Sequence, residues 1–222
     1  MGVNAKKRIL IVDDHPIIRC GLKQTIDSEP DMTVCGEACD VNEARKAIRD
    51  TKPDMAIIDI SLKDSNGLDL IKDLRNQYPN LYILTNSVHS ESVYGERVLR
   101  AGARGYITKD ADPDELLVAI RKVLSGQLYT SETMATRIVD KMFCGRVSQG
   151  QSPVDCLSDR ELEVFQLIGQ GFSTRQIADR LFLSVKTIGT YRAHIQDKLS
   201  LSGANDLLQY AIQWTASQAA VG

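Results

Sequence analysis

Asp54-Met55-Ala56-Ile57-Ile58-Asp59 is the stretch of sequence that decides the fold. Four apolar residues run without a polar break and end at a carboxylate, a pattern typical of a short strand buried on both faces, as in a parallel sheet. Loop-forming residues follow from Ser61 to Gly67. The pattern therefore places Asp59 at the carboxyl end of the strand, where open α/β sheets bind ligands. The alternative is that Asp59 only caps the next helix.

Residues 6–125 repeat the same alternation of apolar strand and amphipathic helix. The expected strands are residues 9–12, 32–34, 55–59, 81–84 and 105–109. Strands that alternate with helices are joined by right-handed crossovers into a parallel sheet with helices on both faces. We therefore expect a five-stranded, doubly wound α/β domain of the flavodoxin type.

One edge of this predicted sheet collects charged and hydroxyl side chains. Asp13 and Asp14 follow the first strand, Asp59 ends the third, and Ser87 and Lys109 end the fourth and fifth. Three carboxylates in one cleft repel one another unless a cation offsets their charge. Mg²⁺ binds a few carboxylates and waters while leaving positions for phosphate oxygens. Lys109 adds a positive charge and Ser87 a hydroxyl donor, so the predicted chemistry is an aspartyl phosphate formed on Asp59.

The same residues carry a resemblance to a known family. The run from Ile9 to His15, the strands that end at Asp59 and Ser87, and the run from Ala101 to Lys109 resemble the receiver domain of bacterial two-component response regulators. The resemblance extends over residues 6–125. It implies that Asp59 accepts a phosphoryl group from a sensor histidine kinase.

This resemblance also implies roles for particular residues. It implies that Mg²⁺ is held by Asp13 through water, by Asp14, by Asp59 and by the backbone carbonyl of Ser61. Beside Lys109, Ser87 and Tyr106 would form a switch pair: Ser87 moves to bond the phosphoryl group, and the Tyr106 ring turns inward to fill the vacated space. The receiver would catalyse only its own phosphoryl transfer and a slow dephosphorylation, so an enzyme in the ordinary sense is not expected.

Residues 126–156 differ in composition from the sequence on either side. Ser131-Glu132 is a helix-start signal, and apolar residues follow it at helical spacing from Met134 to Phe143. The polar run from Gly145 to Pro153 contains Gly, Ser, Gln and Pro, which is typical of a flexible linker. We therefore expect a linker with a helix between two domains.

Capped helices dominate residues 157–218. Ser158 and Glu161 have the spacing of a capping box, and Ser173 and Ser184 are placed to cap two further helices. Two short helices joined by a tight turn are typical of a helix-turn-helix, whose second helix enters the major groove. The outward positions of that helix carry hydroxyls, cations and small side chains, which suits contact with phosphates and bases. The alternative is a solvated helix face, since the region is neutral overall.

The second half also resembles a known family. Leu157 to Val164, Gly171 to Ala178 and Leu183 to Ile188 resemble the LuxR-type DNA-binding domain, and the order of the two domains is that of the NarL/FixJ subfamily. The resemblance implies an all-α domain of four helices over residues 157–218. Its third helix would read promoter half-sites in double-stranded DNA, and its fourth would pair two protomers into a homodimer. The DNA-binding residues expected are Ser173, Thr174, Arg175, Ser184, Lys186, Thr187, Gly189, Thr190, Tyr191, Arg192 and Lys198.

The composition limits the alternatives. A length of 222 residues, of which 43% are hydrophobic and 25% charged, suffices for two packed domains, and a net charge of −2 argues against a wholly basic nucleic-acid coat protein. We find no pattern of a signal peptide or membrane span, and the five cysteines lack a zinc-ligand spacing. We therefore expect reduced thiols in a cytoplasmic protein. Two other functions stay open: a metal-dependent phosphohydrolase, and a receiver whose second domain binds protein instead of DNA.

Overall fold

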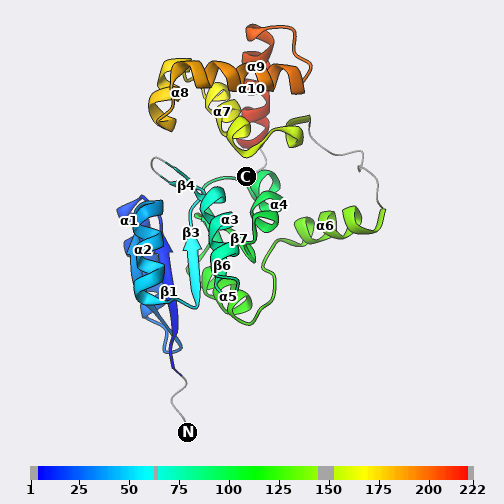
Figure 1. The fold of residues 1–222 in the computed structure, drawn as a ribbon. Coiled ribbons are helices and arrows are strands. Elements are labelled where there is room, and N and C mark those ends of the chain that lie inside the picture. The colour runs from blue at the N-terminus through cyan, green and yellow to red at the C-terminus, as the bar shows by residue number, and fades with distance from the viewer. Residues whose placement is uncertain (1–4, 63–64, 145–152, 220–222) are drawn as a thin grey trace. The chain divides into compact units, whose positions relative to one another are not determined.

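The chain forms two compact units that divide between Val139 and Asp140. A computed structural model describes residues 5–62, 65–144 and 153–219 (Figure 1). The expected linker run at residues 145–152 lies outside the described residues. Each unit is described by itself below.

The first unit is built on a five-stranded sheet in which every neighbouring pair is parallel. The strands, in the spatial order of the sheet, are β2 (Met32–Ala38), β1 (Lys7–Val12), β3 (Met55–Ile58), β6 (Tyr82–Ser87) and β7 (Gly105–Thr108). The helices are α1 (Pro16–Asp27), α2 (Val41–Thr51), α3 (Gly67–Gln77), α4 (Glu91–Ala101) and α5 (Pro113–Leu124). The doubly wound α/β fold expected from the sequence is confirmed (Figure 1).

The central strands are buried on both faces. Ile9 and Ile11 pack with α1 and α5 in one core, whereas Leu10 lies on the other face, close to Ala47 of α2. All residues of β3 are buried, which explains why its sequence shows an unbroken apolar run instead of an alternating one. Strand order reverses between β1 and β3, because the chain goes outward to β2 and then returns. Side chains that follow β1 and β3 therefore lie at the switch point where such sheets bind ligands.

The loop after β3 contains structure that its composition did not predict. A short antiparallel pair, β4 (Ser61–Leu62) and β5 (Ser65–Asn66), stands where we expected an irregular loop. The Asn66 side chain accepts a hydrogen bond from the Leu68 amide and caps α3, so Asp59 is not the cap of that helix. Gly67 is required here because a Cβ atom on it would lie 2.0 Å from the carbonyl oxygen of Asp59.

The second unit is helical. Its described elements are η1 (Pro153–Cys156), α7 (Asp159–Gly169), α8 (Thr174–Leu181), α9 (Val185–Lys198) and α10 (Ala204–Ala219), and α6 (Glu132–Cys144) crosses the boundary between the units. The capping box of Ser158 and Glu161 is confirmed, and Ser173 forms a second box with Gln176 that the sequence analysis did not predict. A core of buried apolar side chains joins the four main helices, including Leu162, Phe165, Ile177, Ile188, Ile195 and Leu207. This arrangement confirms the expected all-α domain.

Candidate functional site

A single lysine is shared by two buried carboxylates at the switch point of the sheet. Asp13, Asp59 and Lys109 come directly after β1, β3 and β7. The Nζ atom of Lys109 lies 2.6 Å from Oδ2 of Asp13 and 2.7 Å from Oδ2 of Asp59. Asp13 is 2% exposed and Asp59 is 1% exposed. Both negative charges are therefore removed from water, and one ammonium group faces both of them.

Burial and the neighbouring charges shift the pKa values of Asp59 and Lys109. Burial raises the pKa of Asp59, the hydrogen bond from Lys109 lowers it, and the neighbouring Asp13 charge raises it, with a net upward shift. Burial alone would lower the pKa of Lys109, but its hydrogen bonds to Asp13 and Asp59 outweigh burial and raise it. Lys109 therefore stays cationic, and its single charge faces two carboxylates.

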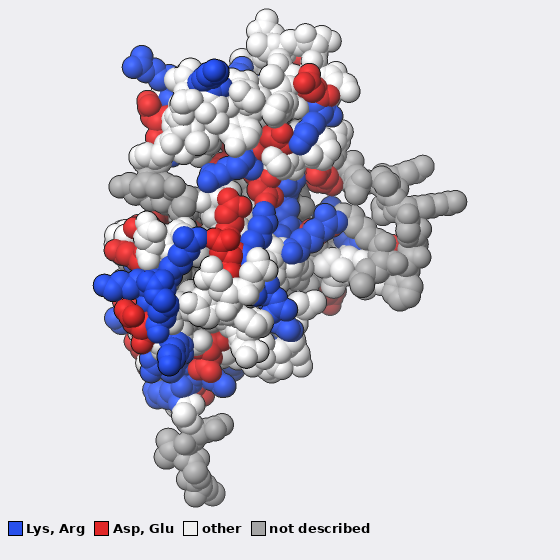
Figure 2. Space-filling view, viewed as in Figure 1, with Lys and Arg blue, Asp and Glu red and all other residues white. Residues whose placement is uncertain are grey.

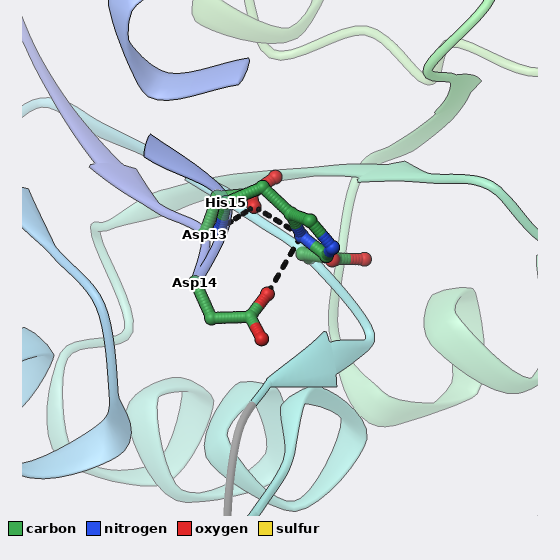
Figure 3. Close-up of side chains that lie close together, drawn as sticks. Asp13, Asp14 and His15 are labelled. Atoms are coloured by element: carbon green, nitrogen blue, oxygen red, sulfur yellow. Dashed lines mark hydrogen bonds and ion pairs between the residues drawn. The ribbon is translucent and has the colours of Figure 1, made fainter. Parts of the chain in front are cut away.

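Asp14 and His15 extend the cluster (Figure 3). The Nδ1 atom of His15 lies 3.1 Å from Oδ1 of Asp13 and 2.8 Å from Oδ1 of Asp14. Oδ1 of Asp14 is buried and receives no hydrogen bond, because the imidazole approaches it without hydrogen-bond geometry. Asp13, Asp14, His15 and Asp59 each offer a ligand atom, and these four atoms all lie within 4.8 Å of one another. The donor set and the orphaned oxygen fit a divalent cation.

His89 connects the Asp59 loop to the predicted switch residues. Its Nε2 atom lies 2.8 Å from Oγ of Ser61, whose backbone amide donates to Oδ1 of Asp59. The backbone carbonyl of His89 accepts a hydrogen bond of 2.6 Å from the Tyr106 hydroxyl, and its amide donates to Oγ of Ser87. Burial and the Lys109 charge lower the pKa of His89 to about 4, so the ring is neutral near pH 7. Movement of Ser87 or Tyr106 is thereby coupled to the loop that carries Asp59.

The structure brings together every predicted side chain of the receiver site and adds two histidines. Burial also raises the pKa of Tyr106, which keeps its hydroxyl protonated as a donor. The sequence analysis missed His15 and His89 as parts of the site. The available signal was position: His15 directly follows Asp14, and His89 comes two residues after Ser87, so both follow strands that end at this edge.

In the second unit, the expected DNA-binding residues fall into two structural groups. Lys186, Gly189 and Thr190 are exposed on α9, as is Arg175 on α8. Among the capping residues, the hydroxyl of Ser184 accepts from the Thr187 amide at 3.0 Å. Ser173 caps α8, Thr174 begins it, and Tyr191 and Arg192 are half-buried on α9. In the exposed group, the Thr190 hydroxyl donates to the Lys186 carbonyl of its own helix, whereas the capping residues hold helix ends.

Lys198 has an intramolecular partner that the sequence analysis did not predict. Its Nζ atom lies 2.6 Å from Oε2 of Glu161, which is 3% exposed. This bond ties the end of α9 to the start of α7, 37 residues earlier. On the face seen in Figure 2, acidic and basic side chains are interspersed over both units. On that face, neither unit presents a wholly basic surface.

Comparison with known proteins assigns the class. The family model described as "Response regulator receiver domain" matches residues 9–121, and the model for "Bacterial regulatory proteins, luxR family" matches residues 155–211. The chain belongs to these families. It is a two-component response regulator that acts as a transcription factor through a LuxR-type DNA-binding domain.

Individual relatives match all or part of this chain. The chain is 35% identical to the oxygen regulatory protein NreC of Staphylococcus haemolyticus over 93% of this chain and 97% of that protein. It is 26% identical to RcsB from Salmonella enterica serovar Typhimurium, solved bound to promoter rprA in the presence of the phosphomimetic BeF3⁻, with a TM-score of 0.65 over 93% of this chain and 98% of that one. A LuxR-family response regulator from Aurantimonas sp. is 35% identical, with a TM-score of 0.57, over 62% of this chain and 99% of that one. Among the residues that the structure describes, none of the helices has both the length and the hydrophobicity needed to cross a bilayer.

Proposed function

We propose that Asp59 accepts a phosphoryl group from a sensor histidine kinase, and that residues 6–125 are the domain that performs this transfer. The observation that carries the proposal is the shared Lys109 ammonium, which lies 2.7 Å from the Asp59 carboxylate at the ligand-binding edge of the sheet. A carboxylate oxygen of Asp59 attacks phosphorus while the bond to the donor breaks on the opposite side. Lys109 then bonds one phosphoryl oxygen, and the Ser87 hydroxyl donates to another.

Mg²⁺ is the cation that best suits this donor set. Asp13, Asp14 and Asp59, with the backbone carbonyl of Ser61, would hold it through oxygen ligands. When bound, Mg²⁺ neutralises charge on the phosphoryl oxygens during transfer. The orphaned Oδ1 atom of Asp14 supports this assignment, because a buried carboxylate oxygen that receives no hydrogen bond can serve as a ligand.

Phosphorylation would shift the population of receiver conformations. A phosphoryl group adds a charge of about −2 at a buried position. This charge favours a state in which the Ser87 hydroxyl bonds the phosphoryl group and the Tyr106 ring, already buried at 2% exposure, stays turned inward. The hydrogen bond from Tyr106 to the His89 carbonyl gives the switch a direct connection to the segment that leads into α4. Residues 126–156 then act as the linker that lets the second domain separate from the receiver.

The second domain, residues 157–218, would bind promoter half-sites as a homodimer in the cytoplasm. Support comes from the RcsB relative, which was solved on promoter DNA with a phosphomimetic. The exposed residues Lys186, Gly189 and Thr190 of α9 would face the major groove. Lys186→Ala should weaken binding to all sequences, and Thr190→Ala should change the sequence preference. Quantitative footprinting on matched and scrambled half-sites separates these two effects.

The phosphoacceptor assignment is tested with acetyl phosphate and Mg²⁺. Wild-type protein should gain a phosphoryl group that is stable in acid and labile in base, measured by gel mobility and intact mass. Asp59→Asn should gain none. Asp54→Asn is the matched control, because Asp54 directly precedes the same strand but its carboxylate bonds the Arg8 amide. Equal phosphorylation of wild type and Asp59→Asn would refute the assignment.

A further inference from the structure

We propose that His15 is a nitrogen ligand of the cation site and makes that site bind transition-metal ions such as Mn²⁺ more tightly than three carboxylates would alone. The inference rests on the proposed function in one respect, namely that a divalent cation binds Asp13, Asp14 and Asp59. It concerns the metal preference of that site, which the phosphoacceptor role of Asp59 does not determine.

The first observation is the position of the imidazole. Its Nδ1 atom lies 2.8 Å from Oδ1 of Asp14 and 3.1 Å from Oδ1 of Asp13, and it belongs to the same group of potential ligand atoms as Asp59. Figure 3 shows the ring turned toward both carboxylates. A nitrogen lone pair that faces two carboxylates is repelled unless a proton or a metal ion lies between them.

The second observation is that His15 occupies a helix cap without capping the helix. It is the N-cap residue of α1, yet its side chain makes no hydrogen bond to the first turn. Ser, Thr, Asp or Asn at this position would stabilise the helix relative to a residue that does not cap. Pro16 and the bond from the His15 amide to the Asp13 carboxylate fix the backbone instead. The His15 side chain therefore contacts the two carboxylates and does not cap the helix.

The ligand preferences of Mg²⁺ and Mn²⁺ predict which ion a His15 ligand would favour. Mg²⁺ prefers oxygen ligands and retains water, whereas Mn²⁺, which also binds oxygen, accepts an imidazole nitrogen more readily than Mg²⁺ does. A site made only of Asp13, Asp14, Asp59 and a carbonyl offers oxygen alone. Addition of the His15 nitrogen should therefore favour Mn²⁺ selectively and leave Mg²⁺ affinity nearly unchanged.

The experiment measures metal affinity of the full-length protein in a mildly alkaline buffer, with no phosphoryl donor present. Free Mn²⁺ is followed by its electron paramagnetic resonance signal during titration, and Mg²⁺ affinity is obtained by competition. His15→Ala should weaken Mn²⁺ binding by about tenfold and leave Mg²⁺ binding unchanged within error. His194→Ala is the matched control, because its side chain is 56% exposed in the other unit, close to the 59% of His15. It should change neither affinity.

A second variant separates ligation from hydrogen bonding. His15→Asn keeps a side-chain donor near Asp14 but removes the imidazole nitrogen. If His15 is a ligand, this variant should lose Mn²⁺ affinity as His15→Ala does. Restoration of Mn²⁺ affinity by Asn would overturn the proposal, as would equal losses of Mn²⁺ and Mg²⁺ affinity in His15→Ala. If wild-type protein bound neither ion, the cation site of the proposed function would fail as well. If wild-type protein bound Mg²⁺ and His15→Ala changed nothing, only the present inference would fail.

Discussion

Each unit of this protein holds a buried carboxylate against a lysine, and the two pairs have opposite consequences. Lys109 lies 2.7 Å from Asp59 in the receiver, and Lys198 lies 2.6 Å from Glu161 in the helical domain. The pKa of Asp59 is nevertheless raised above its ordinary value, whereas the pKa of Glu161 is lowered. The contact distance is almost the same, so the difference lies in the surroundings.

The surroundings differ in the balance between donors and carboxylates. Burial raises the pKa of Glu161, but Lys198 and the amide and hydroxyl of Ser158 all stabilise its charge and outweigh burial. At the receiver edge, Asp13 competes with Asp59 for Lys109. Donors that outweigh burial let the Glu161 carboxylate join two helices, whereas burial dominates at Asp59, which shares Lys109 with Asp13.

The largest expected difference between the two pairs is their response to Mg²⁺. A saturating ion at about 100 times its Kd stabilises the protein that binds it by about 2.7 kcal/mol. We expect this gain in the receiver and none in the helical domain. Hydrogen exchange resolved by peptide, with and without Mg²⁺, reports both units in one chain. Protection that increased equally in α7 and α9 would contradict the contrast.

Removal of the Glu161–Lys198 pair should destabilise the helical domain. Glu161→Gln removes a charge-assisted bond to Lys198 and should lower the free energy of unfolding by about 1–2 kcal/mol, below the value for a fully buried pair because the Lys198 side chain is 40% exposed. Trp214 is the single tryptophan and packs against Phe165, so its fluorescence during urea unfolding reports this domain. Glu163→Gln is the control on the same helix. Its Arg160 partner is 30% exposed, and the loss should stay below about 1 kcal/mol.

Removal of the Asp59 charge should change the stability of the receiver in the opposite direction. In the presence of a chelator, Asp59→Asn removes one of the competing charges and should stabilise the receiver, because burial of that charge is unfavourable and raises the pKa of Asp59. Addition of Mg²⁺ should reverse the order, because the wild type gains more from the ion than the variant does. Circular dichroism melts of both proteins under the two conditions test this. A destabilised Asp59→Asn protein in chelator would show that Asp59 contributes to the fold as Glu161 does.

The smallest expected effect is the pH dependence, whose sign differs between the pairs. The pKa of folded Asp59 lies above its ordinary value of 3.8, so its contribution to receiver stability is present below that pH and is lost as pH rises through the folded pKa. The pKa of folded Glu161 lies below its ordinary value of 4.5, so its contribution is present above that pH and is lost as pH falls through the folded pKa. In metal-free buffer, the difference in stability between wild type and Asp59→Asn should therefore fall as pH rises. The difference between wild type and Glu161→Gln should rise over the corresponding range. Parallel slopes would remove the distinction.

The sequence by itself determined the features that arise within one element. The unbroken apolar run from Met55 to Ile58 predicted a buried parallel strand, and the spacing of Ser158 and Glu161 predicted a capped helix, and the structure shows both. Strand ends of a parallel sheet meet at one edge, so Asp13, Asp59 and Lys109 could also be expected together. These inferences succeed because periodicity, caps and chain direction are local properties.

Only the tertiary structure decided which donor serves which carboxylate. Lys198 bonds Glu161 across 37 residues, and His89 bonds Ser61 across 28, through side-chain conformations that packing of distant elements selects. The turn of His15 toward Asp14 likewise depends on the exact start of α1 beside β1. A sequence pattern states which groups lie near an edge. Distances of a few tenths of an ångström decide whether those groups are satisfied, and only the packed fold sets those distances.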